Sequence, residues 1–219
     1  MSESPTTLSV ESGAAVRVQH LVRAPFYSDE LVTLYHGDAR EIVPMIEADA
    51  LVSDPPYPNN AGHFDADIPA ACDVLRAWSG GEAMVFWWEM DKPPMQLPHV
   101  ATHIWHRTNV NGRPYEPVYH YAPDGEKRRS CVGRFPAIFN GAGPGCAEYM
   151  GHPTQKGVAL MQWLIAKLRK PTVILDPFCG VGATLRAAKN LRIRAIGIEQ
   201  NEQYCETTAR RMEQGVLAL

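Results

Sequence analysis

Short apolar runs alternate with amphipathic stretches along most of the 219-residue chain. The apolar runs predict strands near residues 31–37, 49–54, 83–88, 100–107, 116–122, 171–176 and 194–199. Apolar residues three or four positions apart predict helices near residues 39–47, 68–79, 154–169, 183–191 and 201–215. This alternation is typical of an α/β fold, in which helices cover both faces of a mostly parallel sheet. Ligands of such sheets bind beyond the carboxyl ends of the strands.

The same pattern predicts how the chain is divided. Residues 1–28 are weakly patterned and are predicted to form an N-terminal arm. Residues 29–219 contain no internal repeat and no linker, so we expect one domain, and the chain is long enough for a substantial core.

The strand predicted to end near residue 54 runs into an acid, two prolines and an aromatic ring, which are Asp54, Pro55, Pro56 and Tyr57. Each proline fixes its own φ and favours an extended conformation in the residue before it, so Asp54 cannot continue into a helix. The resulting corner presents a carboxylate, carbonyl oxygens with few local donors and a flat ring. These groups can hold a planar group that bears an amine. The alternative is an ordinary loop after a strand, with Tyr57 on the surface.

A second motif runs from Val173 to Thr184 and joins an apolar strand to a glycine turn and a helix. The next strand ends at Glu199, at about the distance from Gly182 that dinucleotide sites use. Leu185 stands where the third glycine of a dinucleotide fingerprint would be. A nucleoside ligand without a pyrophosphate, such as S-adenosylmethionine, therefore fits this turn better than NAD does.

Together these motifs resemble the amino-methyltransferases of DNA that modify N6 of adenine or N4 of cytosine. The strand 32–36 with Gly37-Asp38, the segments 104–109 and 116–121, and the segment 151–156 (Gly-His-Pro-Thr-Gln-Lys) are similar to further family segments, although Gly157 replaces a proline. The resemblance covers roughly residues 30–216, and its order, with the catalytic motif first, is that of the circularly permuted β group. It implies a Rossmann-like class I methyltransferase fold, with a mostly parallel seven-stranded sheet and an antiparallel late strand.

The resemblance also implies a mechanism. Asp54 and the carbonyl of Pro55 would accept the two hydrogens of the amine, so that its lone pair points at the methyl sulfonium. The base must leave the duplex, and Tyr57 would stack on it. An acid at position 54 favours adenine, because serine is commoner there in the cytosine enzymes. The alternatives are N4 of cytosine, an amine in RNA, or a non-catalytic partner subunit that binds nucleic acid.

Nine residues are predicted to bind the cofactor. Asp176, Phe178, Gly180 and Gly182 would shape the methionine side, Glu199 would hold the ribose hydroxyls, and Asp38 would reach the adenine amine. Thr184 is a further cofactor-binding candidate. The N-terminus of a helix opening at Thr154, with Lys156, would offer N–H donors and positive charge to a carboxylate. The alternative for Lys156 is a solvated lysine in a first helical turn.

The net charge of −3 is unevenly distributed. Residues 1–100 carry 5 basic and 15 acidic side chains, whereas residues 101–135 carry 6 and 3. The basic residues of the second stretch are candidate phosphate contacts, with a solvated loop as the alternative: Arg107, Arg113, Lys127, Arg128, Arg129 and Arg134.

Target recognition would fall to residues 123–150, which are too few for a separate module. We therefore expect short or relaxed sequence specificity, or recognition completed by a second subunit in a homodimer.

Composition bears on the setting of the protein. Five cysteines without a C-x-x-C pair indicate reduced thiols in a cytoplasm, as in a bacterial or phage-infected cell. No apolar run is long enough to span a membrane, and the polar N-terminus lacks the pattern of a signal peptide. The histidines at 99, 103 and 106 do not predict a metal site, since His103 and His106 fall on opposite faces of a strand. We expect Cys179, Trp87, Trp88 and Trp105 to pack in the protein interior. His63 and Phe64 are candidates for lining a base pocket.

Overall fold

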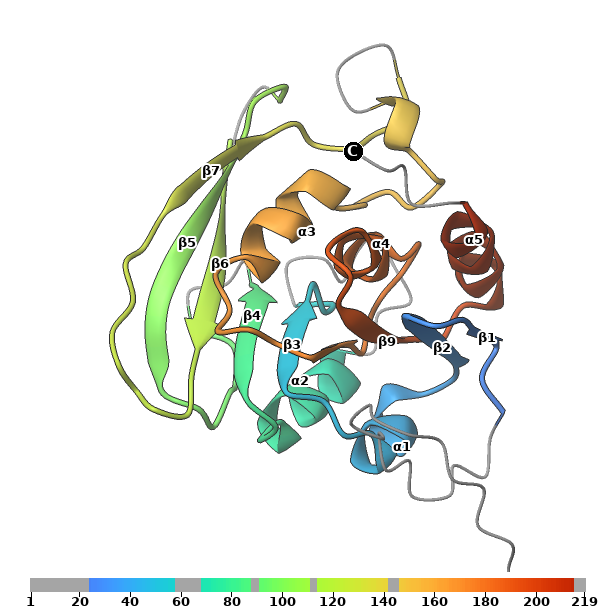
Figure 1. Ribbon diagram of the computed structural model, residues 1–219. Helices are drawn as coiled ribbons and strands as arrows, with labels where there is room; N and C mark the ends of the chain where they lie inside the picture. The colour runs from blue at the N-terminus through green and yellow to red at the C-terminus, as the bar shows by residue number, and fades with distance from the viewer. Residues whose placement is uncertain (1–23, 58–67, 88–90, 111–113, 142–145, 215–219) are drawn as a thin grey trace, which may run out of the picture.

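The computed structural model describes residues 24–57, 68–87, 91–110, 114–141 and 146–214. Within them, nine strands form one sheet in the order β1-β2-β9-β8-β3-β4-β6-β5-β7, with helices on both faces (Figure 1). This arrangement confirms the predicted α/β fold with a mostly parallel sheet.

The parallel part of the sheet is built from five strands. They are β2 (Val32–His36), β9 (Arg194–Glu199), β8 (Val173–Asp176), β3 (Ala50–Ser53) and β4 (Glu82–Phe86). Every neighbouring pair among them is parallel. Their carboxyl ends therefore meet at one edge of the sheet, which we call the carboxyl edge.

The remaining strands extend both sides of this core. β6 (Tyr115–Tyr121) is antiparallel to β4 and to β5 (His99–Arg107), so β5 runs in the same direction as β4. The sequence predicted these two strands but missed β7 (Val132–Phe135), which pairs parallel to β5, and β1 (Tyr27–Ser28), which pairs antiparallel to β2. The sheet thus has nine strands rather than seven. Of the predicted arm, residues 1–23 lie outside the described residues, and its end supplies β1.

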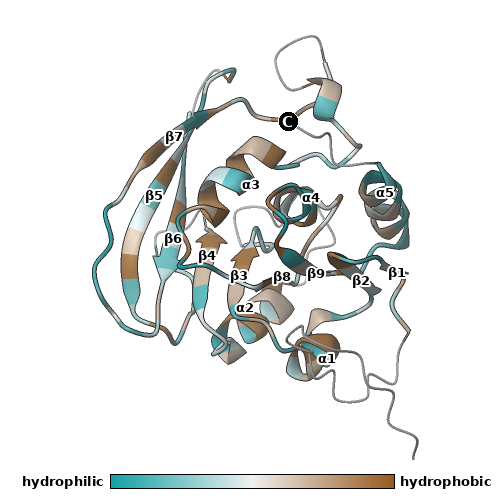
Figure 2. Ribbon diagram, viewed as in Figure 1, coloured by the Kyte–Doolittle hydropathy of each residue, from teal (hydrophilic) through white to brown (hydrophobic). Residues whose placement is uncertain are grey.

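Two hydrophobic layers sandwich the sheet. One contains apolar side chains of α3 (Val158–Ile165), α4 (Ala183–Asn190) and α5 (Glu202–Glu213), and the other those of α1 (Ala39–Ile42) and α2 (Ile68–Ala77). The central strands β3 and β4 are apolar toward both layers, as burial on both faces requires (Figure 2).

Two predicted helices differ from those observed. The one expected over residues 39–47 ends as α1 at Ile42 and continues as the 3₁₀ turn η1 (Val43–Met45), because Pro44 lacks the N–H that an α-helix would need. The one expected from residue 154 begins as α3 at Val158, after Gly157 in an extended conformation. Within the described residues, no helix is long and apolar enough to cross a bilayer.

Candidate active site

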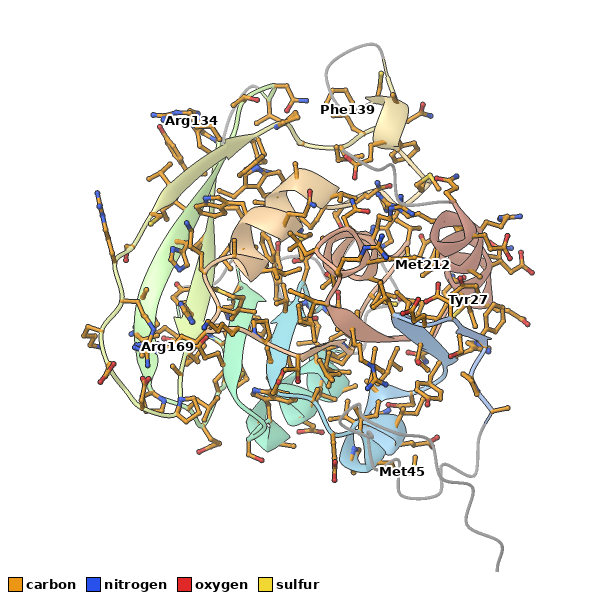
Figure 3. All side chains as sticks on the ribbon, in the orientation of Figure 1. Tyr27, Met45, Arg134, Phe139, Arg169 and Met212 are labelled. Carbon is orange, nitrogen blue, oxygen red and sulfur yellow. The ribbon has the colours of Figure 1, made fainter. Side chains whose placement is uncertain are left out.

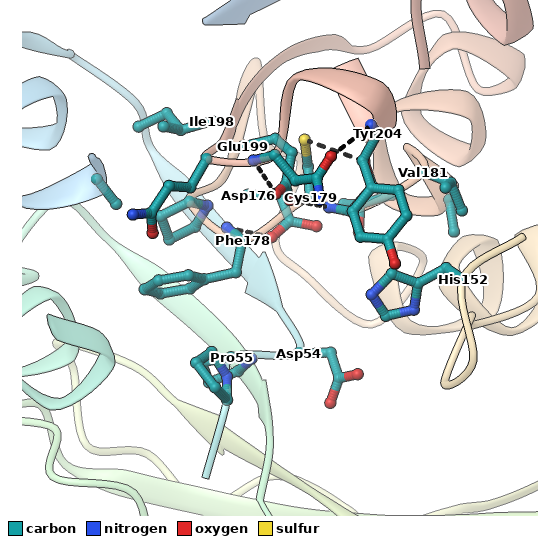
Figure 4. A pocket seen from close by; sticks show the side chains of 18 of the residues that line it. Asp54, Pro55, His152, Asp176, Phe178, Cys179, Val181, Ile198, Glu199 and Tyr204 are labelled. Atoms are coloured by element: carbon teal, nitrogen blue, oxygen red, sulfur yellow. Dashed lines mark hydrogen bonds between the residues drawn. The ribbon is translucent and has the colours of Figure 1, made fainter. Parts of the chain in front are cut away.

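A cavity of about 460 Å³ opens at the carboxyl edge of β2, β9, β8 and β3. Its lining includes eleven predicted site residues, which come from three distant parts of the chain: Asp38, Asp54, Pro55, Pro56, Thr154, Lys156, Asp176, Phe178, Gly180, Thr184 and Glu199. In Figure 4, Asp54 and Pro55 lie on one side of the cavity, and Glu199 and Tyr204 on the other. The corner at Asp54 and the glycine turn after β8 thus meet in one cavity.

The glycine turn forms one wall of the cavity. Gly180 and Gly182 have φ values of 52° and 75°, which residues with a Cβ rarely adopt. A Cβ at Gly182 would also lie 2.6 Å from Cγ2 of Thr208. The turn therefore needs glycine for both its backbone conformation and its packing, and Gly182 leads directly into α4.

Glu199 fixes this turn from the end of β9. Its Oε2 accepts a hydrogen bond from the N–H of Gly180 at 2.8 Å, and its Oε1 accepts from the N–H of Asn201 at 2.8 Å. Burial raises the pKa of Glu199. Each oxygen keeps a further lone pair that can accept from a ligand hydroxyl.

Asp176 closes the end of β8 and is 3% exposed. Its Oδ1 accepts from Oγ of Ser53 at 2.7 Å and from the N–H of Phe178 at 3.2 Å. Burial nevertheless raises the pKa of Asp176 to about 6, against the effect of hydrogen bonds that include one from Thr184. Its charge therefore responds to a cation bound in the cavity.

Asp38 caps α1 at the far side of the cavity. Its Oδ1 accepts from the N–H of Arg40 at 2.8 Å, and the Arg40 guanidinium pairs with Oδ2 at 2.6 Å. The hydrogen bonds from Arg40 lower the pKa of Asp38. Asp38 thus presents an ionised acceptor to the cavity.

Lys156 meets the carboxylate of Asp54. Its Nζ donates to Oδ2 of Asp54 and lies 3.6 Å from Oε1 of Glu116, a buried residue of β6. Burial opposes the charge on the ammonium, yet the two acids raise the pKa of Lys156. Oδ1 of Asp54 is buried and has no hydrogen-bond partner among the described residues.

The prediction for residues 154–156 is therefore corrected in part. Thr154 lines the cavity but stands in a turn four residues before α3, so no helix N-terminus opens there. Gln155 is buried and links Met150 to Glu148, because its Oε1 accepts from the Met150 N–H at 2.7 Å and its Nε2 donates to the Glu148 carbonyl at 2.7 Å. Lys156 is neither solvated nor in a helical turn.

Tyr57 lies behind the corner that precedes it. Its side chain is 7% exposed, and its ring centroid is 5.9 Å from that of Trp87. Unlike Pro55 and Pro56, it does not line the cavity.

The sequence assigned no role to His152 and Tyr204, which cover the glycine turn. Their ring centroids are 4.9 Å apart, and both rings line the cavity (Figure 4). Cδ2 of His152 lies 3.5 Å from the Cβ position of Gly180. Burial, together with the charge of Lys156, lowers the pKa of His152 to about 4, so its ring is neutral at pH 7. The signal for His152 was its place in the His-Pro-Thr-Gln-Lys segment.

The predicted phosphate contacts do not form one group. Arg128 donates to Glu82, the first residue of β4, at 2.9 Å, and to Asp124, which also pairs with Arg169. This network places residues 127–129 at the amino ends of the strands, opposite the cavity. Arg134 lies near the carboxyl end of β7, far from Arg169 (Figure 3). Arg107 ends β5 at the carboxyl edge, with its guanidinium carbon 5.7 Å from the Trp105 ring centroid.

Several side chains considered from the sequence belong to the core. Trp87 and Trp105 are buried, as predicted, and burial raises the pKa of the Cys179 thiol. His103 is buried beside His120, and the described residues contain no cluster of His, Cys, Asp or Glu that could hold a metal ion. His63, Phe64, Trp88 and Arg113 lie outside the described residues.

This chain is similar to known proteins. A family model described as DNA methylase matches residues 72–210, which is more than half of the chain. Type II methyltransferase M2.DpnII of Streptococcus pneumoniae is 41% identical over 63 residues, which are 28% of this chain and 24% of that protein. Type II methyltransferase M2.MboI of Moraxella bovis is 36% identical over 89 residues, which are 40% of this chain and 31% of that protein. The matches thus span less than a third of either relative.

Solved structures share the fold. The M1.HpyAVI–SAM complex superposes with a TM-score of 0.59 at 22% identity, covering 84% of this chain and all of that chain. PvuII DNA methyltransferase, described as cytosine-N4-specific, superposes with a TM-score of 0.64 at 15% identity, covering 89% and 90%. At these identities the likeness concerns the fold alone. The match to the family model shows that this chain belongs to the DNA methylase family of the N6 and N4 type.

Proposed function

We propose that this chain is an S-adenosylmethionine-dependent methyltransferase that acts on the exocyclic N6 amine of adenine in DNA. The observation that carries this proposal is Oδ1 of Asp54, a buried acceptor without a partner among the described residues, on a residue that lines the cavity. A buried carboxylate oxygen without a donor is costly, so a ligand N–H is its natural partner.

The opposite wall of the cavity fits the methyl donor. A volume of about 460 Å³ lies within the range of small-molecule sites. The left-handed glycines let the backbone approach the ligand, Glu199 offers acceptors to ribose hydroxyls, and Asp176 offers an acceptor to the α-ammonium of the methionine part of the cofactor. When bound, S-adenosylmethionine would supply a methyl group on a positively charged sulfur.

The Asp54 side would prepare the amine. Its nitrogen is a poor nucleophile, because the lone pair is delocalised into the ring. Oδ1 of Asp54 and the carbonyl of Pro55 would accept its hydrogens and direct the lone pair into the cavity, so that rate is gained by orientation and charge complementarity. The base would have to leave the duplex. Tyr57 supports this corner from behind, and stacking on the base would require its ring to move.

Arg107 and Arg134 are the described cations that we propose as phosphate contacts, since both lie toward the carboxyl edge. The described part of the 123–150 segment contributes β7 to the sheet, which leaves little of it for reading bases. We therefore propose short or relaxed specificity, or a homodimer in which a second copy completes recognition. Sequencing the marks left on mixed-sequence DNA tests this, and a long, strict consensus from a monomer would contradict it.

Transfer of tritiated methyl groups to DNA polymers lacking either adenine or cytosine tests the reaction. We expect labelling that requires adenine and is lost in Asp54→Ala. Labelling that requires cytosine instead would identify N4 as the target, and labelling of RNA alone would replace DNA as the substrate. Wild-type incorporation no higher than that of Asp54→Ala would indicate a non-catalytic partner subunit. Asp73→Ala is a suitable control, because Asp73 is exposed on α2 and its ion pair among the described residues is with Arg76 on the same helix.

A further inference from the structure

Lys156 is placed to organise Asp54 rather than to bind a ligand. We propose that Lys156 is a positioning residue, which holds Oδ2 of Asp54 so that Oδ1 alone is left for the substrate amine. Glu116 in turn holds Lys156. This inference deepens the proposed methyl transfer and rests on it for the identity of the amine.

The Lys156 ammonium is buried between aromatic rings and two carboxylates. The side chain is 8% exposed, and Nζ lies 4.8 Å from the ring centroid of Phe86 and 5.8 Å from that of Trp105. Aromatic faces attract a cation but accept no conventional hydrogen bond. Among the described residues, the charged acceptors near Nζ are the carboxylates of Asp54 and Glu116, and charge pairing is strengthened in this low-dielectric setting.

The charged groups around Asp54 also favour its pairing with Lys156. Lys156 is one cation between two acids, Asp54 and Glu116. Its charge also helps to lower the pKa of His152. Arg107 partly offsets the charge of Glu116. Among the described residues, two further titratable groups face the pair: Asp176, on which the charge of Asp54 acts, and the phenol of Tyr57, which is near Lys156. If Lys156 left Asp54 for a cofactor carboxylate, Asp54 would become a buried acid without its cation.

Glu116 completes the arrangement from β6. It is 5% exposed, and its Oε1 has no hydrogen-bond partner at normal distance among the described residues, although Nζ of Lys156 lies 3.6 Å away. Burial raises the pKa of Glu116, and the charge of Lys156 opposes this effect. Because Asp54 and Glu116 flank the same ammonium, Glu116 limits the positions that Lys156 can take.

The test is a double-mutant cycle with Lys156→Met, Asp54→Asn and the combined variant. Methyl transfer gives kcat and KM, calorimetry gives the Kd of S-adenosylmethionine, and thermal unfolding gives Tm. We expect Lys156→Met to lower kcat about 100-fold while the cofactor Kd changes less than about threefold. In the Asp54→Asn background the same change should lower kcat less than about threefold, because Lys156 acts through Asp54. Lys156→Arg should restore part of the kcat.

Lys167→Met is the matched control: Nζ of Lys167 also lies near an aromatic ring, 5.1 Å from the Trp163 centroid, but it forms no ion pair with a carboxylate of the described residues. We expect it to retain wild-type kcat. In unfolding, Lys156→Met and Asp54→Asn should each lower Tm by about 10 °C, and the combined variant should lose much less than the sum.

The outcomes separate the two proposals. A large rise in the cofactor Kd, or multiplicative effects of the two substitutions on kcat, would overturn the positioning role and restore Lys156 as a cofactor contact. A wild-type protein that binds S-adenosylmethionine but transfers no methyl group would overturn the proposed function. The Tm values would still test the pairing of Lys156 with Asp54. Decreases in Tm that add up in the combined variant would refute this pairing.

Discussion

The ammonium of Lys156, in the segment before α3, donates a hydrogen bond to the carboxylate of Asp54, which lies 102 positions earlier in the chain. The pair joins the corner after β3 to the segment that leads into α3. It leaves one oxygen of Asp54 buried without a partner at the carboxyl edge of the sheet.

Substitution of Asp54 should separate chemistry from cofactor binding. Asp54→Asn keeps the shape of the side chain but replaces one acceptor oxygen by a donor, and it removes the charge that matches the developing charge on the amine. We expect kcat for methyl transfer to fall about 10²- to 10³-fold, with the Kd of S-adenosylmethionine nearly unchanged. Calorimetry and single-turnover transfer measure the two quantities. A loss confined to cofactor affinity would remove Asp54 from the chemistry.

The sequence was sufficient to predict the cavity, for a physical reason. Asp54, Asp176 and Glu199 each follow or end an apolar run, and parallel strands bring their carboxyl ends to one edge. Local chain features therefore determine that these acids converge. The glycine turn could also be predicted from the sequence, because its left-handed conformations exclude most other residues.

The partners of the charged side chains were not predictable in this way. Lys156 was assigned to a cofactor, although its acceptors come from strands far away in sequence. Arg128 was grouped with Arg107, yet β6 runs antiparallel and carries the chain from one edge of the sheet to the other between them. β7 was missed because four residues, one of them glycine, give too little periodicity.

Glu199 should control cofactor affinity through the backbone of the glycine turn. In Glu199→Gln the amide nitrogen cannot accept from the N–H of Gly180 or Asn201, so at least one of these bonds is lost. A loss of about 1–2 kcal/mol corresponds to a rise in the Kd of S-adenosylmethionine of about tenfold. Glu202→Gln, on the exposed first turn of α5, is the control and should leave Kd unchanged. Equal affinities in all three proteins would contradict the ribose-side assignment.

Asp176 should make stability depend on pH in a defined direction. Its pKa is raised from 3.8 to about 6, so between about pH 4 and 6 the folded chain keeps a proton that the unfolded chain has released. Its contribution to the free energy of unfolding therefore falls as the pH rises through this interval, by about 3 kcal/mol for such a shift.

Urea unfolding of wild type and Asp176→Asn at pH 4 and pH 7 measures this contribution. We expect the variant to gain stability relative to wild type on going from pH 4 to pH 7, because asparagine does not titrate. Asp73→Asn, on the exposed face of α2, should follow wild type at both values. A stability difference between Asp176→Asn and wild type that is the same at both pH values would show that Asp176 does not carry the linkage.

Arg211 links α5 to the cavity walls. It is 4% exposed, and it donates to the carbonyl of Val181 at 3.0 Å and to Oε1 of Glu148 at 2.8 Å. The same Glu148 oxygen accepts from the N–H of Val158 at 2.7 Å, at the start of α3. One guanidinium thus ties the glycine turn to the segment that carries Lys156.

Arg211→Met should lower the free energy of unfolding by about 3 kcal/mol, because it leaves Glu148 without its cation and the Val181 carbonyl without its donor. Arg210→Met is the matched control, since Arg210 is the exposed neighbour on the same helix and should cost less than about 0.5 kcal/mol. Combining Arg211→Met with Glu148→Gln should cost less than the sum of the two single changes, because the second no longer breaks an ion pair. Urea unfolding of the four variants measures these energies. If the losses in free energy of unfolding of the two single variants add up in the double variant, Arg211 stabilises α5 without the help of Glu148. The position of Lys156 would then depend on α3 and Gln155 instead.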